Sequence, residues 1–545
     1  MSVFTRVTLG ILLSLVLLSF PLSAATRTWS GNVSSLWSDP ANWDGHVPVS
    51  GDDLVFPVLG AQWNPVSTND LASGTAFHSI SVLNLGYRIS GNAILLGAGG
   101  LHAAGHLITI SILFSELKFS SITLTESQTW SGSGWGSARV SIGPVNLNGK
   151  TLTFTDGDKF GFDPASGTGS IIHDSPLGST SMASSTYTGP LTVTAGALAF
   201  SGVAGDIRVR GSGIGGDDQS NLNSTTLNLS GATIHSLAIY GSGALSIDLR
   251  APTAASGSLT FVPATGDPAW FVTNAYSAGS GPPVAFSAGG TVTLGNAFLV
   301  VRSSVSSQFT LVNNQGPDPV SGTFLGLPEG AIVNRGLSLK ISYRGGDGND
   351  VTLTALNTVV PGTTTSVRSS SPVLLTQQPI TFTATVTSSG GTPGGQMNFY
   401  DGGILLGTSS LNSAGVSSWT ASFGAGPHLI TAAYLGSDAF ATSQSSVRLC
   451  EAPVLTQQPA SQAVVRDQPV TLIVDATGTS PTFQWYEGFT GDTSRPLSGE
   501  IDRRLIARPQ AGTAFWVKVS NDCGVAQSQT AKITVESPRR RSARH

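Results

Sequence analysis

The tract Thr68–Leu356 constrains the fold more than any other part of this chain. It is a long succession of short β-prone segments separated by Gly, Ser, Thr, Asn and Asp. A period of two between polar and apolar residues is typical of a strand that buries one face, and no comparable tract has helical spacing. The sequence therefore predicts an all-β protein whose strands stack on one another. The clearest alternation lies in Thr151–Thr155, Leu191–Thr194, Ser258–Phe261, Thr291–Leu294 and Val351–Thr354.

The repeats within this tract are irregular. Gly196–Phe200, Gly231–Ile234 and Gly243–Ile247 look like variants of one strand start, yet their first residues are 35 and 12 positions apart. Loops of variable length between stacked rungs would produce such spacing, which favours a parallel β-helix over residues 68–356. A row of β-sandwiches is the alternative. We prefer the β-helix because the tract is long, is punctuated by glycine and lacks Cys…Trp…Cys landmarks.

Composition limits the classes of partner. A chain of 545 residues is expected to hold about three or four domains. Charged residues make up 11% of it, against about 25% in a typical soluble protein. The formal net charge of -4 gives no electrostatic basis for binding nucleic acid or an anionic membrane.

The first 25 residues have the features of a signal peptide. Arg6 precedes the apolar run Leu9–Phe20, and small residues at Ala24 and Ala25 offer a cleavage site. The run is shorter than the roughly 20 residues of a membrane-spanning helix, and no later stretch is long and apolar enough to be one. We therefore expect an exported protein, extracellular or at the cell surface, without a membrane span.

Residues 26–67 contain three tryptophans, Trp29, Trp37 and Trp43, and are predicted to form an N-terminal β cap. Their flat rings could stack on sugars, or they could form a hydrophobic plug that closes the open end of a sheet. We favour the plug. The pattern also resembles the segment that opens many bacterial autotransporter-like passenger regions.

The end of the tract carries a sharper resemblance. Phe309–Gly316, Ser321–Gly330 and Ile341–Leu353 resemble the closing rungs of autotransporter-associated β-strand passengers. That family implies a right-handed parallel β-helix displayed outside the cell. The membrane barrel of the family has no match in this sequence, in which two other domains follow.

A linker at residues 357–362 leads to the first of these domains, at residues 363–448. The segments Phe399–Gly402 and Gly426–Tyr434 resemble the Phe-Tyr-Asp-Gly and Gly-x-His-x-Ile-x-Ala-x-Tyr motifs of the bacterial Ig-like group 3 family. The resemblance implies a β-sandwich.

Residues 450–535 resemble a second sandwich, of the Ig I-set type, and residues 536–545 are expected to be a basic, disordered tail. Trp485 matches the tryptophan of strand C, and Phe515–Asn521 matches strand F. Val474 and Val517 stand where such domains usually place inter-sheet cysteines. The resemblance implies that these two valines, Trp485 and Trp516 form the structural core.

The chain contains two cysteines, Cys450 and Cys523. Export favours their pairing as a disulfide, because no other partner exists within the chain. A free catalytic thiol is the alternative, but no nearby histidine in the sequence suggests a base.

Three further patterns could carry chemistry, and each has a simpler structural interpretation. Gly345–Asp350, with Asp347 and Asp350, resembles one calcium-binding β-roll repeat, but a single copy is more simply an Asp/Gly turn. His102 and His106 would share a helical face, yet they lie among strand signals. Two aspartate pairs could cleave glycosidic bonds, but Asp and Gly are also turn residues: Asp156 with Asp158, and Asp217 with Asp218.

We therefore assign no catalytic residue, no metal ligand and no cofactor. The sequence predicts a secreted or cell-surface, non-enzymatic structural or adhesion protein. Its β-helix would be a stalk or contact surface for a carbohydrate or protein ligand, and its Ig-like modules would be spacers. The alternative is an extracellular protein that binds or depolymerises polysaccharides on the flank of the β-helix.

Overall fold

The computed structural model describes residues 25–536, except for a set of short stretches, and within the described residues no helix is long and apolar enough to cross a membrane. The stretches outside the description are 59–64, 84–85, 105–113, 134–138, 156–158, 163, 212–224, 242, 249–252, 263–267, 275–283, 302–307, 335–337, 357, 375, 450, 467, 480 and 522. Residues 1–24 and 537–545, which hold the predicted signal peptide and most of the predicted basic tail, also lie outside the described residues.

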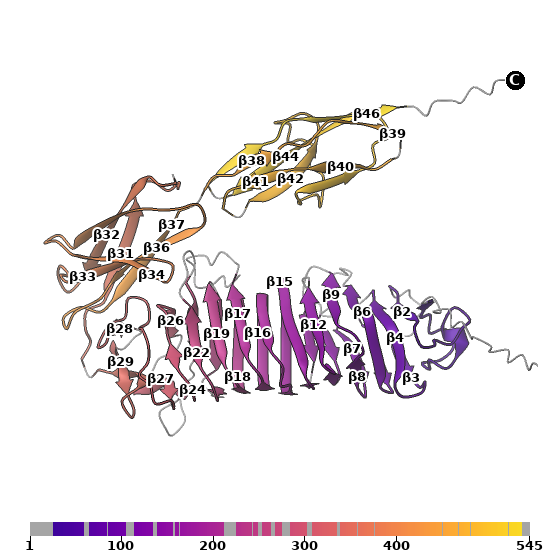
Figure 1. The fold of residues 1–545 in the computed structure, drawn as a ribbon, viewed down its shortest axis with the longest axis horizontal. Coiled ribbons are helices and arrows are strands. Elements are labelled where there is room, and N and C mark those ends of the chain that lie inside the picture. Colours follow the sequence, from indigo (N-terminus) through magenta and orange to yellow (C-terminus); the bar gives the residue numbers. More distant parts are fainter. Residues whose placement is uncertain are drawn as a thin grey trace, which may run out of the picture.

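The first and longest part of the chain forms one 30-stranded mixed sheet, which we call the stack. Its strands lie side by side in one long array (Figure 1). A short 3-10 turn, η1 (Pro40–Asn42), interrupts its start. The strands are β1 Thr26–Thr28, β2 Asp53–Phe56, β3 Val66–Asn69, β4 Thr75–Val82, β5 Arg88–Gly91, β6 Ile94–Ala104, β7 Phe114–Phe119, β8 Ile122–Leu124, β9 Gln128–Ser133, β10 Arg139–Ile142, β11 Val145–Asn146, β12 Lys150–Thr155, β13 Lys159–Phe162, β14 Ala165–Ser166, β15 Gly169–Thr186, β16 Leu191–Ala204, β17 Ile207–Gly211, β18 Thr226–Ile234, β19 Leu237–Gly241, β20 Ala244–Asp248, β21 Thr253–Ala255, β22 Leu259–Val262, β23 Trp270–Asn274, β24 Val284–Ala288, β25 Val292–Thr293, β26 Phe298–Val301, β27 Phe309–Asn314, β28 Ile332–Asn334, β29 Ser338–Gly345 and β30 Asp350–Ala355.

Up to β27, most strands of the stack pair with a strand one repeat further along the chain. Between β1 and β27, every ladder that the described residues form is parallel. Register partners can be only 16 residues apart, as Thr192 and Arg208 are, or as many as 33, as Thr260 and Thr293 are. The irregular spacing in the sequence therefore arises from connections of variable length between strands that remain in register. β1 and β2, which lie in the segment 26–67, belong to the same sheet.

The core of the stack is built from rows of inward-facing side chains. One row, at most 1% exposed, runs in register through Leu152, Ile171, Leu191, Ile207, Leu237, Leu259 and Val292. The residue that follows each of these points the other way, because side chains alternate along a strand. Thr153, Thr192, Thr260 and Thr293 are therefore half-buried outward positions. The alternation predicted from the sequence is confirmed at these strands.

The stack closes differently from the expected closing rungs. β30 pairs antiparallel with both β27 and β29, and β28 pairs antiparallel with β29. The short turn at residues 346–349 explains the pairing of β29 with β30, because a tight turn can join only antiparallel neighbours. The resemblance had implied further parallel rungs, and for Ile341–Leu353 that expectation is wrong.

The next part of the chain has seven strands in two sheets that face each other across a core. One sheet has the order β31-β32-β35 and the other β34-β33-β36-β37. Phe382, Phe399 and Tyr434 are fully buried in the core between them. The strands are β31 Thr363–Ser369, β32 Pro379–Ser388, β33 Gln396–Asp401, β34 Ile404–Ser410, β35 Val416–Ser422, β36 His428–Tyr434 and β37 Ser443–Leu449.

The last part of the chain is a second sandwich-like unit. Its main sheet runs β39-β46-β44-β42 with β45 beside β44, and two small sheets pair β38 with β41 and β40 with β43. Figure 1 shows this unit in yellow, beyond the first sandwich. The strands are β38 Val454–Gln457, β39 Gln462–Val465, β40 Val470–Ile473, β41 Asp475–Thr477, β42 Thr482–Glu487, β43 Arg504–Ala507, β44 Thr513–Asn521, β45 Gly524–Gln527 and β46 Ala531–Glu536.

Candidate functional site

The three N-terminal tryptophans are buried at the first end of the stack. Trp29 and Trp37 are 0% exposed and Trp43 is 4% exposed. Trp37 packs edge-on against Trp43, with ring centroids 5.6 Å apart, and Trp43 Nε1 donates to the Trp37 carbonyl at 3.1 Å. Their burial leaves no open ring face for a sugar and is what a hydrophobic plug requires.

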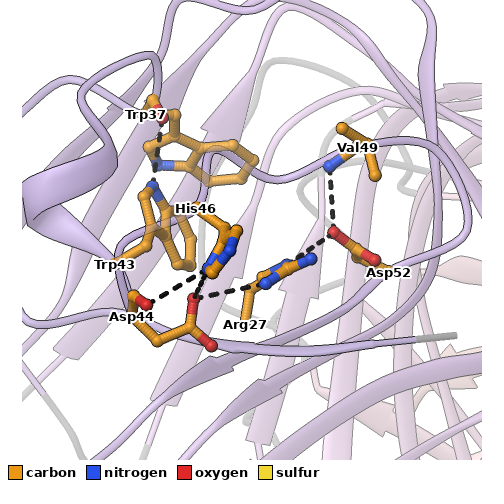
Figure 2. Close-up of polar contacts among 7 residues, drawn as sticks. All are labelled: Arg27, Trp37, Trp43, Asp44, His46, Val49 and Asp52. Atoms are coloured by element: carbon orange, nitrogen blue, oxygen red, sulfur yellow. Dashed lines mark hydrogen bonds and ion pairs between the residues drawn. The ribbon is translucent and has the colours of Figure 1, made fainter.

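A charged network lies over this plug (Figure 2). Arg27 Nε donates to Asp52 Oδ2 at 3.0 Å, and Arg27 Nη1 donates to Asp44 Oδ1 at 3.4 Å. The hydrogen bond to Asp52 is the main cause that raises the pKa of Arg27, and burial opposes it. Because Asp52 Oδ2 also accepts from the Val49 N–H at 3.0 Å, the network ties the 44–52 segment to β1.

The two histidines at helical spacing do not form a described pair. His102 lies in β6, where its Nδ1 is 2.8 Å from Ser131 Oγ of the neighbouring strand β9. His106 lies outside the described residues. Among the residues that are described, no group of three or more His, Cys, Asp or Glu side chains is arranged to hold a metal ion.

The Gly345–Asp350 segment forms the hairpin turn between β29 and β30. The Gly348 N–H donates to the Gly345 carbonyl at 2.8 Å, and the Asp350 carboxylate accepts from the Asn314 N–H at 2.9 Å. Burial is the main cause that raises the pKa of Asp350. Asp350 thus fastens the turn to β27, which is a structural role.

The aspartate pairs considered for glycoside cleavage cannot be placed. Asp156 and Asp158, and Asp217 and Asp218, all lie outside the described residues. The catalytic interpretation therefore receives no support from geometry.

In the last unit, Trp485, Val474 and Val517 share one buried core, and Trp485 Nε1 donates to the Asp502 carbonyl at 2.9 Å. Trp516 is also buried, but it lies on the other face of the sheet. There it stacks on Tyr486 with ring centroids 4.8 Å apart. Strand alternation explains the difference, because Trp516 is adjacent to the inward-facing Val517.

The predicted disulfide has one end outside the described residues, which is Cys450. Asn521 Nδ2 donates to the Glu451 carbonyl at 2.7 Å, and Asn521 Oδ1 accepts from the Cys523 N–H at 2.9 Å. These bonds bring the neighbour of Cys450 to the turn that holds Cys523. The Cys450–Cys523 bond stays a prediction.

Sequence reasoning missed a buried ion pair in the first sandwich. His428 Nδ1 lies 2.6 Å from Asp401 Oδ2, and His428 Nε2 lies 3.2 Å from the Gly424 carbonyl. The hydrogen bond to Asp401 is the main cause that raises the pKa of His428, and burial opposes it. Both residues stand in the motifs quoted for the Ig-like family, but only pairing of β33 with β36 brings them together.

Several hollows on the described surface are open to ligands, and one of about 690 Å³ lies between Phe483 and Arg503 in the last unit. Another of about 490 Å³ lies beside β43, with Leu505 and Phe515 in its floor and Glu487 and Glu500 among its lining residues. A third of about 270 Å³ crosses β15, β16, β18 and β20 on the flank of the stack. The third one is lined by the polar residues Ser181, Asn228 and Ser246 together with apolar ones such as Ala183 and Ala199.

The comparisons with known proteins identify one domain. Residues 364–449 match the family "Bacterial Ig-like domain (group 3)", which confirms that resemblance. No curated protein matches the chain. The autotransporter resemblance of the stack is not supported by any of these comparisons.

Similar solved structures are tandem modules. They include titin domains Z1Z2 in complex with telethonin, with 18% identity, 32% of this chain and 97% of that chain covered, and a TM-score of 0.15. Fibronectin(III)-like modules of Clostridium thermocellum CbhA have 16% identity, coverages of 33% and 99%, and a TM-score of 0.18. Sidekick-1 immunoglobulin domains 1–4 have 17% identity, coverages of 37% and 58%, and a TM-score of 0.21. At TM-scores this low, none of these structures indicates a function for this chain.

Proposed function

We propose that the chain is an exported, non-enzymatic structural or adhesion protein that acts outside the cell or at its surface. In this account the stack is a right-handed parallel β-helix that serves as a rigid stalk and contact surface. The two sandwiches are the bacterial Ig-like domain and an I-set-like domain stapled by Cys450 and Cys523. Residues 1–25 direct export.

The observation that carries this proposal is the continuous buried core of the stack, which its parallel ladders span despite local register shifts. Its buried core extends from Trp29 to Leu353 as one cluster of side chains. Parallel ladders join consecutive repeats, so each rung buries its apolar face on the next. Such an array transmits force along its length and presents long flanks, which suits a stalk or contact surface.

Binding without turnover tests the proposal. The purified protein is passed over immobilised plant and bacterial polysaccharides and over intact bacterial cells, and reducing ends are measured in the same samples. We expect retention on at least one surface with no release of reducing ends. Absence of retention on every surface would contradict an adhesive role, and release of reducing ends would contradict a non-enzymatic one.

The second candidate is a polysaccharide-binding flank, which the 270 Å³ hollow favours. Its hydroxyl and amide side chains can hydrogen-bond to sugars, and its small side chains leave room for a ring. Ala199→Trp should fill this hollow, whereas Thr233→Trp, at another exposed position on the stack, is the matched control. Loss of polysaccharide retention with Ala199→Trp alone would place binding at this flank, and equal retention by both variants would exclude it.

A further inference from the structure

One outward-facing row of side chains in the stack changes from small residues to large aromatic ones at its last rungs. Trp270 and Phe298 end this row, and their rings stack with centroids 4.7 Å apart and planes at 16°. Large aromatic side chains on the outer face of a sheet form an apolar patch unless another surface covers them. The positions before them in register carry small side chains: Ser179, Ala197, Thr226 and Ala244.

The bacterial Ig-like domain covers this patch. Phe298 and Leu325 of the stack form one buried cluster with Tyr400 and Ala433 of the Ig-like domain, and Trp270 packs at its edge. Ala433 is 1% exposed although it does not belong to the core of its own domain. The backbones also approach closely, because a side chain at Gly326 would meet the Ala433 Cβ at 2.6 Å.

Hydrogen bonds fix the orientation of the contact. Asn296 Nδ2 donates to the Gly403 carbonyl at 2.9 Å. The Ile332 carbonyl accepts from the Thr442 N–H at 2.8 Å and from Thr442 Oγ1 at 3.0 Å. These bonds join turns and strand ends on both sides, so the domain cannot rotate on the stack without breaking them.

The connecting segment is part of the same contact. The Val360 N–H donates to Ser338 Oγ at 2.9 Å, and the Val360 carbonyl accepts from Asn334 Nδ2 at 2.8 Å. Val360 also packs with Ile332 and Ala441 in a second apolar cluster between the two parts. A segment held in this way does not act as a free linker.

We infer that the bacterial Ig-like domain is an intramolecular lock on the stack and not a spacer. It seals the aromatic flank of the last rungs and forms one rigid body with them. Bending of the molecule is therefore placed beyond Leu449, between the two Ig-like domains. This inference does not depend on the proposed adhesive function.

Hydrogen exchange of the full chain tests the lock, because the Thr442 N–H donates across the contact and reports its opening. Ala433→Arg places a charge in the buried cluster but not in the core of the Ig-like domain. We expect Thr442 exchange to accelerate by about tenfold, which corresponds to 1.4 kcal/mol of lost docking. Amides in the β33–β36 ladder should keep the exchange rates of the parent protein.

Two further variants keep the test decisive. Ser418→Arg adds the same side chain at an exposed position of β35 and should leave Thr442 exchange unchanged. Asn296→Gly removes only the amide bond to Gly403 and keeps the left-handed backbone, with φ of 54°, available. It should accelerate Thr442 exchange even if Ala433→Arg fails to fold. Unchanged Thr442 exchange in a folded Ala433→Arg or Asn296→Gly protein, or equal acceleration in Ser418→Arg, would overturn the lock.

Discussion

His428 and Asp401 form a buried pair whose contribution to stability must depend on pH. The ordinary pKa of histidine is 6.5, and the pairing raises the pKa of His428 above that value. The stability that the pair contributes is therefore fully present below pH 6.5 and is lost as the pH rises through the raised pKa. We expect the melting temperature of the bacterial Ig-like domain to fall as the pH rises in this range. Asp401→Asn should destabilise it by about 3 kcal/mol, because the histidine charge loses its buried partner.

The chain offers a matched control for this prediction. His235 and Asp206 have the same 2.6 Å separation between nitrogen and oxygen, but their side chains are 66% and 45% exposed. Solvent screens an exposed pair, so Asp206→Asn should cost less than about 1 kcal/mol. Loss of hydrogen-exchange protection on heating the full chain reports both sites, through the β33–β36 ladder for the Ig-like domain and through β17 for the control. Equal effects of the two substitutions, or a melting temperature that rises with pH, would contradict the assignment.

His173 has the opposite pH dependence. It lies inside the stack, where its Nδ1 donates to the Ala195 carbonyl at 2.7 Å and burial lowers its pKa. The unfolded chain then binds a proton more readily than the folded one, so stability falls as the pH drops below 6.5 and through the lowered pKa. His173→Phe should remove this acid sensitivity while costing about 1–3 kcal/mol for the unpaired Ala195 carbonyl. Unchanged acid sensitivity of β15 exchange in that variant would exclude His173 as its source.

At the scale of elements, the N-terminal plug is expected to stabilise the first rungs of the stack. Trp37 contacts Trp43, Phe56 and Phe77, so Trp37→Ala should cost about 3–5 kcal/mol. Hydrogen exchange should accelerate in β2 to β5. Leu36→Ala is the matched control, because Leu36 is adjacent in sequence and 42% exposed. Similar exchange in both variants would show that the plug does not hold these rungs.

The predicted staple in the last domain is another element-scale device. In the chain-entropy treatment, a disulfide that closes the loop between Cys450 and Cys523 stabilises the folded state by about 4.5 kcal/mol. Cys523→Ser in the full chain should therefore lower the melting temperature of the last domain by about 10 °C or more. The bacterial Ig-like domain should be unaffected. A disulfide-linked dimer, or free-thiol labelling of both cysteines in the oxidised protein, would show that the pair serves another purpose.

At the scale of the whole molecule, the sequence predicted the features that local residue patterns encode, which are the positions of strands and the family of one domain. Alternation in Thr151–Thr155 and Leu191–Thr194 located real strands, and the motifs at Phe399–Gly402 and Gly426–Tyr434 identified the Ig-like domain. The antiparallel closure was missed because pairing direction follows from the length of a connection and not from alternation. Contacts between distant segments were also missed. The pair of Asp401 with His428, and the cover of Phe298 by Tyr400, depend on sheet pairing and domain docking that no single segment encodes.

Consecutive repeats of the stack are expected to rise by a constant step, whatever the length of chain between them. Thr153 and Ala238 are four register steps apart, and Thr153 and Thr293 are six steps apart, through Ile172, Thr192, Arg208, Ala238 and Thr260. At a strand spacing of ~4.8 Å, these separations correspond to about 19 Å and about 29 Å along the stack.

Distances between spin labels carried on non-natural amino acids at these positions measure this rise. Pulsed electron–electron double resonance on the full chain should give a narrow distance distribution for each pair of labels. The mean distance for the pair at 153 and 293 should exceed that for the pair at 153 and 238 by about 10 Å, the rise of two rungs. Broad distributions, or a difference that follows the number of intervening residues and not the number of rungs, would contradict a continuous parallel stack.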